Sequence, residues 1–142
     1  MDEPRPGAAT RSVAVSIVNY GTSETVLAAL PGLIRELARL PDHHVVIVDN
    51  DSPGEDGARL ADGLAALDMG PKVEVIRSRL NGGFAAGNNL AFAAIRRLGW
   101  TPDAVLLFNP DAEMRPGALL EMLAVMDAHP KAGFVGPRLE NT

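Results

Sequence analysis

Apolar residues gather along the chain in short runs rich in β-branched residues, separated by longer stretches in which apolar positions recur at helical spacing. A short apolar run that stops abruptly in polar residues is typical of a strand buried in a parallel sheet. Five runs have this form: residues 12–20, 44–49, 73–76, 105–108 and 133–136.

The stretches between these runs predict helices, because their apolar residues lie every three or four positions. We expect the first helix to be capped by Thr22 or Ser23 and kinked at Pro31. A third helix follows a glycine-rich loop of residues 81–89, and a fourth has Pro116 in its first turn. Alternating strands and helices indicate right-handed crossovers, and hence an α/β fold with a mostly parallel sheet covered on both faces.

Polar residues follow three of the predicted strands at the point where each strand ends. They are Asn19-Tyr20, residues 49–52 and residues 109–113. Parallel strands point their carboxyl ends the same way, and open α/β sheets bind ligands at that edge, so we expect the three segments to share one crevice. Asn, Asp, Ser and Pro are also ordinary turn and helix-cap residues, but three such strand ends together favour a binding site.

The residue types in this crevice suit a nucleotide and a metal ion. Tyr20 offers a flat face on which a nucleobase can stack, although an aromatic packed on the first helix is the ordinary alternative. Asp49, Asn50 and Asp51 can read a base edge or ribose hydroxyls, or instead form an Asx turn and a helix cap. Asp111 and Glu113 are two carboxylates that can hold a hard divalent cation together with phosphate oxygens.

The glycine-rich loop fits neither of two common phosphate motifs. Its glycines are Gly82, Gly83 and Gly87, which is not the G-x-G-x-x-G of a dinucleotide fold, and no Gly-Lys-Ser/Thr follows. Glycines can still let the backbone approach a ligand, with helix amides facing a phosphate. The three histidines lie away from the polar strand ends, so we assign none of them to chemistry.

The composition of the chain restricts the number of domains, the kinds of partner and the location that we expect. With 142 residues, 46% of them hydrophobic, we expect one domain over residues 12–142 after a disordered lead-in of residues 1–11. A net charge of −5 with scattered basic residues argues against a nucleic acid polymer as partner. There is no cysteine and no apolar run of membrane-spanning length, so a cytoplasmic protein is expected, with peripheral attachment at the inner face of the cell membrane as an option.

Taken together, five segments resemble an inverting, family-2-type glycosyltransferase with the GT-A fold, particularly its rhamnosyltransferase-like branch. The resemblance implies a Rossmann-like three-layer α/β/α sandwich. It also implies transfer of a sugar, with inversion, to a hydroxyl of a saccharide or lipid-linked acceptor. The sugar donor would be dTDP-rhamnose or a UDP-sugar. The resemblance further implies a role in the synthesis of cell-wall polysaccharide. The matching segments are residues 15–20, 46–52, 81–89, 106–111 and 135–139.

The resemblance also implies roles for individual residues. The residues expected to hold the nucleotide are Val18, Tyr20, Asp49, Asn50 and Asn109. Those expected at the donor sugar and diphosphate are Asn81, Gly82, Gly83, Asn88 and Asn89. Asn109-Pro110-Asp111 stands in place of the family's D-x-D motif, so Asp111 would contact Mg²⁺ or Mn²⁺, with Glu113 as a further candidate ligand.

In such enzymes the general base lies downstream of the D-x-D, so here it is expected beyond Thr142. The sequence therefore resembles the donor-binding half of a transferase, which we expect to bind nucleotide, to turn over poorly alone, and to self-associate through an exposed sheet edge. One alternative is a catalytically silent nucleotide-sugar-binding or assembly module. Another is a nucleotidyltransferase, whose glycine-rich basic loop is not seen at residues 19–22.

Overall fold

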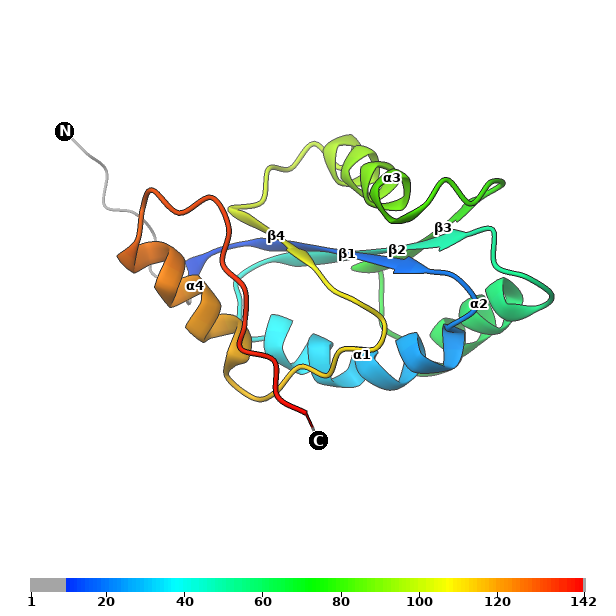
Figure 1. Ribbon diagram of the computed structural model, residues 1–142, viewed down its shortest axis with the longest axis horizontal. Coiled ribbons are helices and arrows are strands. Elements are labelled where there is room, and N and C mark those ends of the chain that lie inside the picture. Colours follow the sequence, from blue (N-terminus) through cyan, green and yellow to red (C-terminus); the bar gives the residue numbers. More distant parts are fainter. Residues whose placement is uncertain (1–9, 142) are drawn as a thin grey trace.

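The computed structural model describes residues 10–141 and contains one sheet of four parallel strands in the order β3-β2-β1-β4 (Figure 1). The strands are β1 (Val13–Asn19), β2 (His43–Asn50), β3 (Val73–Ser78) and β4 (Ala104–Leu107). A helix follows each strand: α1 (Ser23–Leu37), α2 (Asp56–Leu67), α3 (Phe84–Arg97) and α4 (Ala118–Ala128). The predicted α/β fold with a parallel sheet is therefore confirmed.

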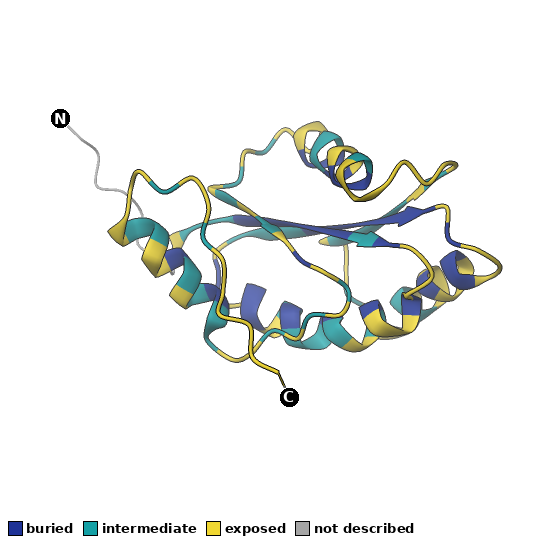
Figure 2. Cartoon of the chain, viewed as in Figure 1, coloured by how far each residue is buried: buried dark blue, intermediate teal, exposed yellow. Residues whose placement is uncertain are grey.

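Helices cover the sheet unequally. Helix α3 lies alone on one face, whereas α1, α2 and α4 lie on the other (Figure 1). Successive strand residues point to opposite faces, so Val13, Val15 and Ile17 pack in the larger core with α1, and Ala14 packs under α3. The central strands β1 and β2 are buried on both faces (Figure 2), which explains their nearly continuous apolar sequence.

Small residues let α3 approach the sheet closely. A Cβ atom added to Gly87 would lie 2.8 Å from Cγ1 of Val18, so this helix position has no room for a side chain. Beside it, the Ser16 hydroxyl donates a 2.6 Å hydrogen bond to Oδ1 of buried Asn88. The N-terminal half of α3 is thereby fixed against β1, next to the carboxyl edge of the sheet.

Two predicted helix starts are wrong. The glycine-rich segment was expected to form a loop through residue 89, but α3 begins at Phe84, so Asn88 and Asn89 are helical. Gly87 serves packing rather than loop formation. Pro116 lies outside its predicted helix, because α4 begins at Ala118 after an N-cap at Gly117, whose φ of 87° suits glycine.

The predicted strand at residues 133–136 does not form. Residues 133–140 have neither helix nor strand, and Phe134 is 95% exposed. In the described part of the chain the sheet ends at β4, and residues 133–136 do not pair with its free edge. An ion pair of 2.7 Å between Arg115 and Glu140 instead holds this segment to the connection between β4 and α4.

The outer strand β4 carries exposed apolar residues. Val105 and Leu107 pair in register with Ala14 and Ser16, so they face the α3 side of the sheet. Because α3 packs over β1 and β2, these two side chains remain 44% and 46% exposed. The apolar edge expected from the sequence is therefore present.

Two sequence expectations concern the ends and surface of the chain. Residues 1–9 of the predicted lead-in lie outside the described residues, whereas Arg11, also assigned to it, forms an ion pair with Asp127 of α4. None of the helices within residues 10–141 combines the length and apolar character that crossing a membrane requires.

Candidate functional site

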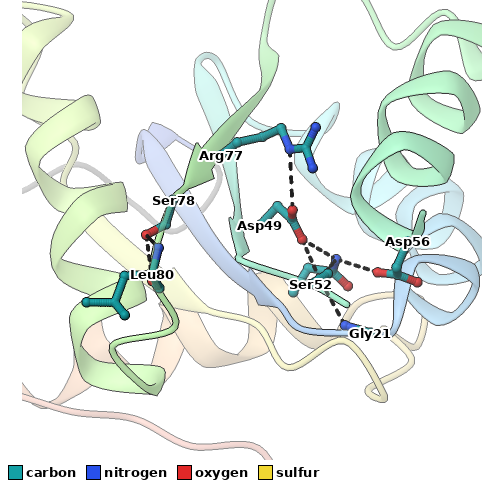
Figure 3. A network of polar contacts seen from close by, with 8 residues as sticks. Gly21, Asp49, Ser52, Asp56, Arg77, Ser78 and Leu80 are labelled. Atoms are coloured by element: carbon teal, nitrogen blue, oxygen red, sulfur yellow. Dashed lines mark hydrogen bonds and ion pairs between the residues drawn. The ribbon is translucent and has the colours of Figure 1, made fainter. Parts of the chain in front are cut away.

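The carboxyl ends of β1 and β2 meet in a buried polar cluster on the α1 and α2 side of the sheet. We call Asn19, Ser23, Asp49, Ser52 and Asp56 the Asn19 cluster. The side-chain amide of Asn19 lies 3.0 Å from Oδ1 of Asp49, 3.2 Å from the Ser52 hydroxyl and 3.0 Å from Oδ2 of Asp56. All five residues are at most 8% exposed, so the predicted meeting of these two strand ends is confirmed (Figure 3).

The cluster holds the connection between β1 and α1, here called the Tyr20 loop (residues 20–22). The Gly21 amide donates to the Ser52 hydroxyl at 2.9 Å (Figure 3). The Thr22 amide donates to Oδ1 of Asn19 at 3.2 Å. Tyr20 itself is 51% exposed. The loop backbone is therefore fixed from below while the aromatic ring reaches the surface.

The side chain that caps α1 is not one of the two expected. Thr22 occupies the N-cap position, but neither its hydroxyl nor that of Ser23 caps the helix. The Ser23 amide and hydroxyl instead donate to Oδ1 of Asp56, at 3.2 and 2.7 Å. An acidic side chain from α2 thus satisfies the N-terminus of α1.

Asp56 is stabilised in its charged form. Burial raises the pKa of this carboxyl, but hydrogen bonds from Ser23, Asn19 and Ser52 outweigh burial and bring its pKa below the ordinary value. Asp56 therefore remains a carboxylate at neutral pH. Its negative charge interacts favourably with the partial positive charge at the N-terminus of α1.

Asp49 makes its contacts inside the protein. Its Oδ1 accepts from Asn19 and Ser52, and its Oδ2, which has no hydrogen-bond partner in the described chain, lies 3.6 Å from Nε of Arg77 (Figure 3). The residue is completely buried. Gly57 closes the space beside it, since an added Cβ would lie 2.4 Å from Asp49 Oδ2.

Asn50 faces the opposite side of the sheet, toward α3. Its side-chain amide donates to Oδ1 of Asn81 at 2.9 Å and to the carbonyl of Gly83 at 3.0 Å. Its own Oδ1 is buried and has no hydrogen-bond partner among residues 10–141. Of the predicted nucleotide and donor residues, the structure thus brings Asn50, Asn81 and Gly83 together.

The start of α3 lies beside this group. Gly83 is its N-cap, with a φ of 91°, and within the described residues no side chain caps the helix. The first amides of an α-helix have no partner within the helix and carry partial positive charge, so they suit an anion. Of the two asparagines expected here, Asn89 is exposed, whereas Asn88 is buried and bonded to Ser16 and to the carbonyl of Phe84.

The connection after β4 runs beside α1. Asn109, Asp111 and Glu113 are exposed, and the two acids line a cavity of about 250 Å³ together with α1 residues that include Thr25 and Arg35. Within residues 10–141, no hydrogen bond joins this segment to the Asn19 cluster. The third strand end thus lies along α1, between Thr25 and Arg35, without joining the buried cluster.

The carboxylates of Asp111 and Glu113 suit a divalent cation only as part of a shared site. Both are exposed oxygen donors, but the described residues contain no group of three or more His, Cys, Asp or Glu side chains that could hold a metal. Mg²⁺ and Mn²⁺ prefer about six oxygen ligands, so phosphate oxygens and water would have to complete the set. This is the arrangement expected where metal and nucleotide bind together.

Two of the three histidines lie at the opposite edge of the sheet, as expected. His43 and His44 begin β2, and Nε2 of His44 lies 3.2 Å from a carboxylate oxygen of Glu74. Burial, followed by the charge of Lys72, lowers the pKa of His43. Neither side chain reaches the carboxyl edge, where the polar clusters lie.

Nearly the whole chain matches one protein family. The model for glycosyl transferase family 2 matches residues 12–141, which is nearly the whole chain. The chain belongs to glycosyl transferase family 2. None of the curated proteins compared with it is a significant sequence match.

Solved structures show the same fold as this family 2 chain. A mannosyltransferase from Pyrobaculum calidifontis, in complex with GDP-Man and Mn²⁺, superposes with a TM-score of 0.66 at 17% identity, covering 85% of this chain and 34% of that one. TarS from S. aureus gives 0.58 at 20% identity, covering 84% and 33%. The expected GT-A architecture is thus confirmed, and the chain spans about a third of the length of these structures.

Sequence reasoning missed two members of the site in this family 2 chain. Asp56 was not predicted to cap α1, and Arg77 was not predicted to approach Asp49. Asp56 could have been suspected as an acid in the first turn of a predicted helix, beside a glycine. Arg77 gave no such signal, because its partner is set by the β2–β3 register.

Proposed function

We propose that this family 2 chain binds a nucleoside-diphosphate sugar at the carboxyl edge of its sheet, for transfer of the sugar with inversion to an acceptor hydroxyl. The observation that carries the proposal is the buried, unpartnered Oδ1 of Asn50 beside the uncapped start of α3. A buried polar atom without a partner costs free energy unless a ligand supplies the missing hydrogen bond. Family membership supports a nucleotide sugar as that ligand.

The base half of the site would be formed by Asn50 and Tyr20. Oδ1 of Asn50 can only accept, so it favours a base with an N–H at its pairing edge, as in uracil, thymine or guanine. Cytosine has an acceptor at N3, the ring position where uracil and thymine carry an N–H, and its donor is the exocyclic N4 amine. Tyr20 would stack on the base, with Val18 beneath it and Asn109 at the ribose. Asp49 would support this half from within the protein, since its carboxylate is bonded to Asn19 and Ser52 and lies beside Arg77.

The diphosphate would bind at the start of α3. The amides of residues 21–23 already donate to side chains of the Asn19 cluster, so the start of α1 has fewer donors to offer a phosphate. The start of α3 has no side-chain cap, and Gly82 and Gly83 let a ligand approach its backbone. Asn81 and Asn89 would face the diphosphate or sugar, while Asn88 anchors the helix.

A divalent ion, Mg²⁺ or Mn²⁺, would be held by Asp111, with Glu113 as a second ligand. When bound, such an ion neutralises the charge that develops on the departing diphosphate. The mannosyltransferase that shares this fold was solved with Mn²⁺ and a nucleotide sugar. We propose dTDP-rhamnose or a UDP-sugar as donor and a saccharide or lipid-linked hydroxyl as acceptor, following the resemblance of the motifs.

Calorimetric titration with UDP, dTDP, GDP and CDP, each with and without Mn²⁺, tests the proposal. We expect UDP or dTDP to bind and CDP to bind at least about tenfold more weakly, because N3 of cytosine carries no N–H and would face Oδ1 of Asn50 as a second acceptor. Asn50→Ala should remove this preference, and Asn141→Ala, an exposed asparagine near the end of the chain, should keep it. Equal binding of UDP and CDP would contradict the assignment of Asn50.

A further inference from the structure

Helix α1 is capped by the side chain of another helix. Asp56 is the first residue of α2, yet its Oδ1 accepts from both the amide and the hydroxyl of Ser23, at 3.2 and 2.7 Å. The residue is only 8% exposed. The start of α1 therefore depends on where α2 begins.

The second oxygen of the same carboxylate acts on the Tyr20 loop through Asn19. Oδ2 of Asp56 accepts from the Asn19 amide at 3.0 Å. Oδ1 of Asn19 in turn accepts from the amide and the hydroxyl of Thr22, at 3.2 and 2.8 Å. Oδ1 of Asp56 thus holds Ser23 directly, and Oδ2 holds Thr22 through Asn19. Both carboxylate oxygens therefore fix the chain around Tyr20.

The charge of Asp56 also fixes the orientation of the Asn19 side chain. The Asn19 amide has two hydrogens but three acceptors within 3.2 Å, two of them carboxylate oxygens. If the side chain flipped, its oxygen would face two carboxylates and its NH₂ would face the donors of Thr22. With Asp56 neutral or absent, this preference weakens and the hold on Thr22 weakens with it.

We propose that Asp56 is a positioning residue for nucleotide binding, which holds the Tyr20 loop through Ser23 and Asn19 and so presents the Tyr20 ring to the base. Asp56 is buried behind the loop and acts without touching the ligand. The identity of the ligand rests on the function proposed above. The hold on the loop rests only on contacts within the protein.

Tyr20 provides a specific probe because it is the only tyrosine in the chain. With ring-labelled tyrosine, an NMR spectrum reports this side chain alone. In Asp56→Asn we expect the ring signal to shift or broaden before any nucleotide is added, and the dissociation constant for UDP to rise about fivefold, the effect of losing one helix cap. Asp62→Asn, which removes the same charge from an exposed position of α2, should change neither.

Each result decides the proposal. A folded Asp56→Asn with an unchanged ring signal and unchanged UDP affinity would overturn it. If Asp56→Asn does not fold, Ser23→Ala takes its place, and an unmoved ring signal in that variant would overturn the proposal equally. If the unmodified protein binds no nucleotide, the proposed function fails, whereas the ring signal still shows whether Asp56 positions the loop.

Discussion

Asp49 and Asn50 are neighbours in β2, yet their side chains lie on opposite faces of the sheet and in different polar groups. Asp49 bonds to Asn19 and Ser52 on the α1 and α2 side, and Asn50 bonds to Asn81 on the α3 side. Oδ1 of Asp49 is bonded within the protein and its Oδ2 lies beside Arg77, whereas Oδ1 of Asn50 has neither a hydrogen bond nor an ion pair in the described chain. The two residues should therefore respond differently to substitution.

Asp49→Ala should lower the free energy of unfolding by about 2 to 4 kcal/mol, because it removes the acceptor of the buried Ser52 hydroxyl and one of the three acceptors around the buried Asn19 amide. Urea unfolding followed by circular dichroism measures the loss. Asp62→Ala, at an exposed position of α2, should stay within about 0.5 kcal/mol of the unmodified protein. If Asp49→Ala were as stable as Asp62→Ala, the buried cluster would not contribute to stability as described.

Two glycines of α2 offer a matched test of how firmly Asp49 is held. A Cβ at Gly57 would lie 2.4 Å from Asp49 Oδ2, whereas a Cβ at Gly63 would lie 2.3 Å from the end of the half-buried Leu27 side chain. Asp49 is fixed by hydrogen bonds, but Leu27 can change rotamer. Gly57→Ala should cost about 1 to 3 kcal/mol, despite the better helix propensity of alanine.

Gly63→Ala should change stability by less than about 1 kcal/mol, because the propensity gain offsets the rearrangement of Leu27. Thermal melts of the two variants, run side by side, provide the comparison. Equal melting temperatures for the two variants would show that the side chains around Gly57, those of Asp49 and Arg77, can move to admit a Cβ atom. In that case Asp49 would be less constrained than its hydrogen bonds indicate.

The strands that carry this site could be predicted from the sequence more accurately than the side-chain contacts within it. β1 and β2 were expected within one residue of their observed ends, because a strand buried on both faces is marked by its own apolar residues. The separation of Asp49 from Asn50 follows from the alternation of strand side chains, but whether each would be buried depends on helices far along the chain. The contact between Asp56 and Ser23 depends on how α2 packs against α1.

Two wrong expectations have a common cause. Gly87 indicated a loop, but its absent side chain serves the contact between α3 and Val18. Residues 133–136 have strand composition but do not pair with β4, the outer strand of the described sheet, and Glu140 after them is instead held by Arg115. In both cases the deciding partner lies elsewhere in the fold, so local composition alone could not identify it.

The lowered pKa of Asp56 predicts how acid affects stability. Because its pKa in the folded protein lies below the ordinary value, Asp56 stabilises the fold fully above the unfolded pKa of about 3.9, and this contribution is lost as the pH falls through the lower folded pKa. Asp56→Asn lacks this contribution. The difference in unfolding free energy between the two proteins should be constant above about pH 5 and shrink below pH 4.

Urea unfolding of both proteins between pH 7 and pH 3 measures this difference. Other acids with lowered pKa values, such as Asp42 beside Lys72, are present in both proteins and cancel. A difference that stayed constant down to pH 3 would show that Asp56 does not gain stability from its charge. The hydrogen bonds to Ser23 would then act through geometry alone.

The exposed edge of β4 should allow copies of the chain to associate. Val105 and Leu107 present an apolar surface beside unpaired strand backbone, and such edges pair readily with other strands. Sedimentation should show concentration-dependent oligomers that Val105→Lys reduces. Val125→Lys on α4 is a control of nearly equal exposure, 45% against 44%, and should leave association unchanged. The opposite pattern would place the contact on α4.

Removal of the metal should separate the roles of the two exposed acids after β4. If Asp111 holds the ion against the diphosphate, Asp111→Ala should abolish the gain in UDP affinity that Mn²⁺ provides, and leave metal-free binding unchanged. Uridine lacks the phosphates, so its binding should not depend on Mn²⁺ in either protein. Glu113→Ala reports whether the second carboxylate contributes. A Mn²⁺-dependent gain that survives in Asp111→Ala and disappears in Glu113→Ala would move the metal to Glu113 and away from Asp111, which stands at the second acid of D-x-D.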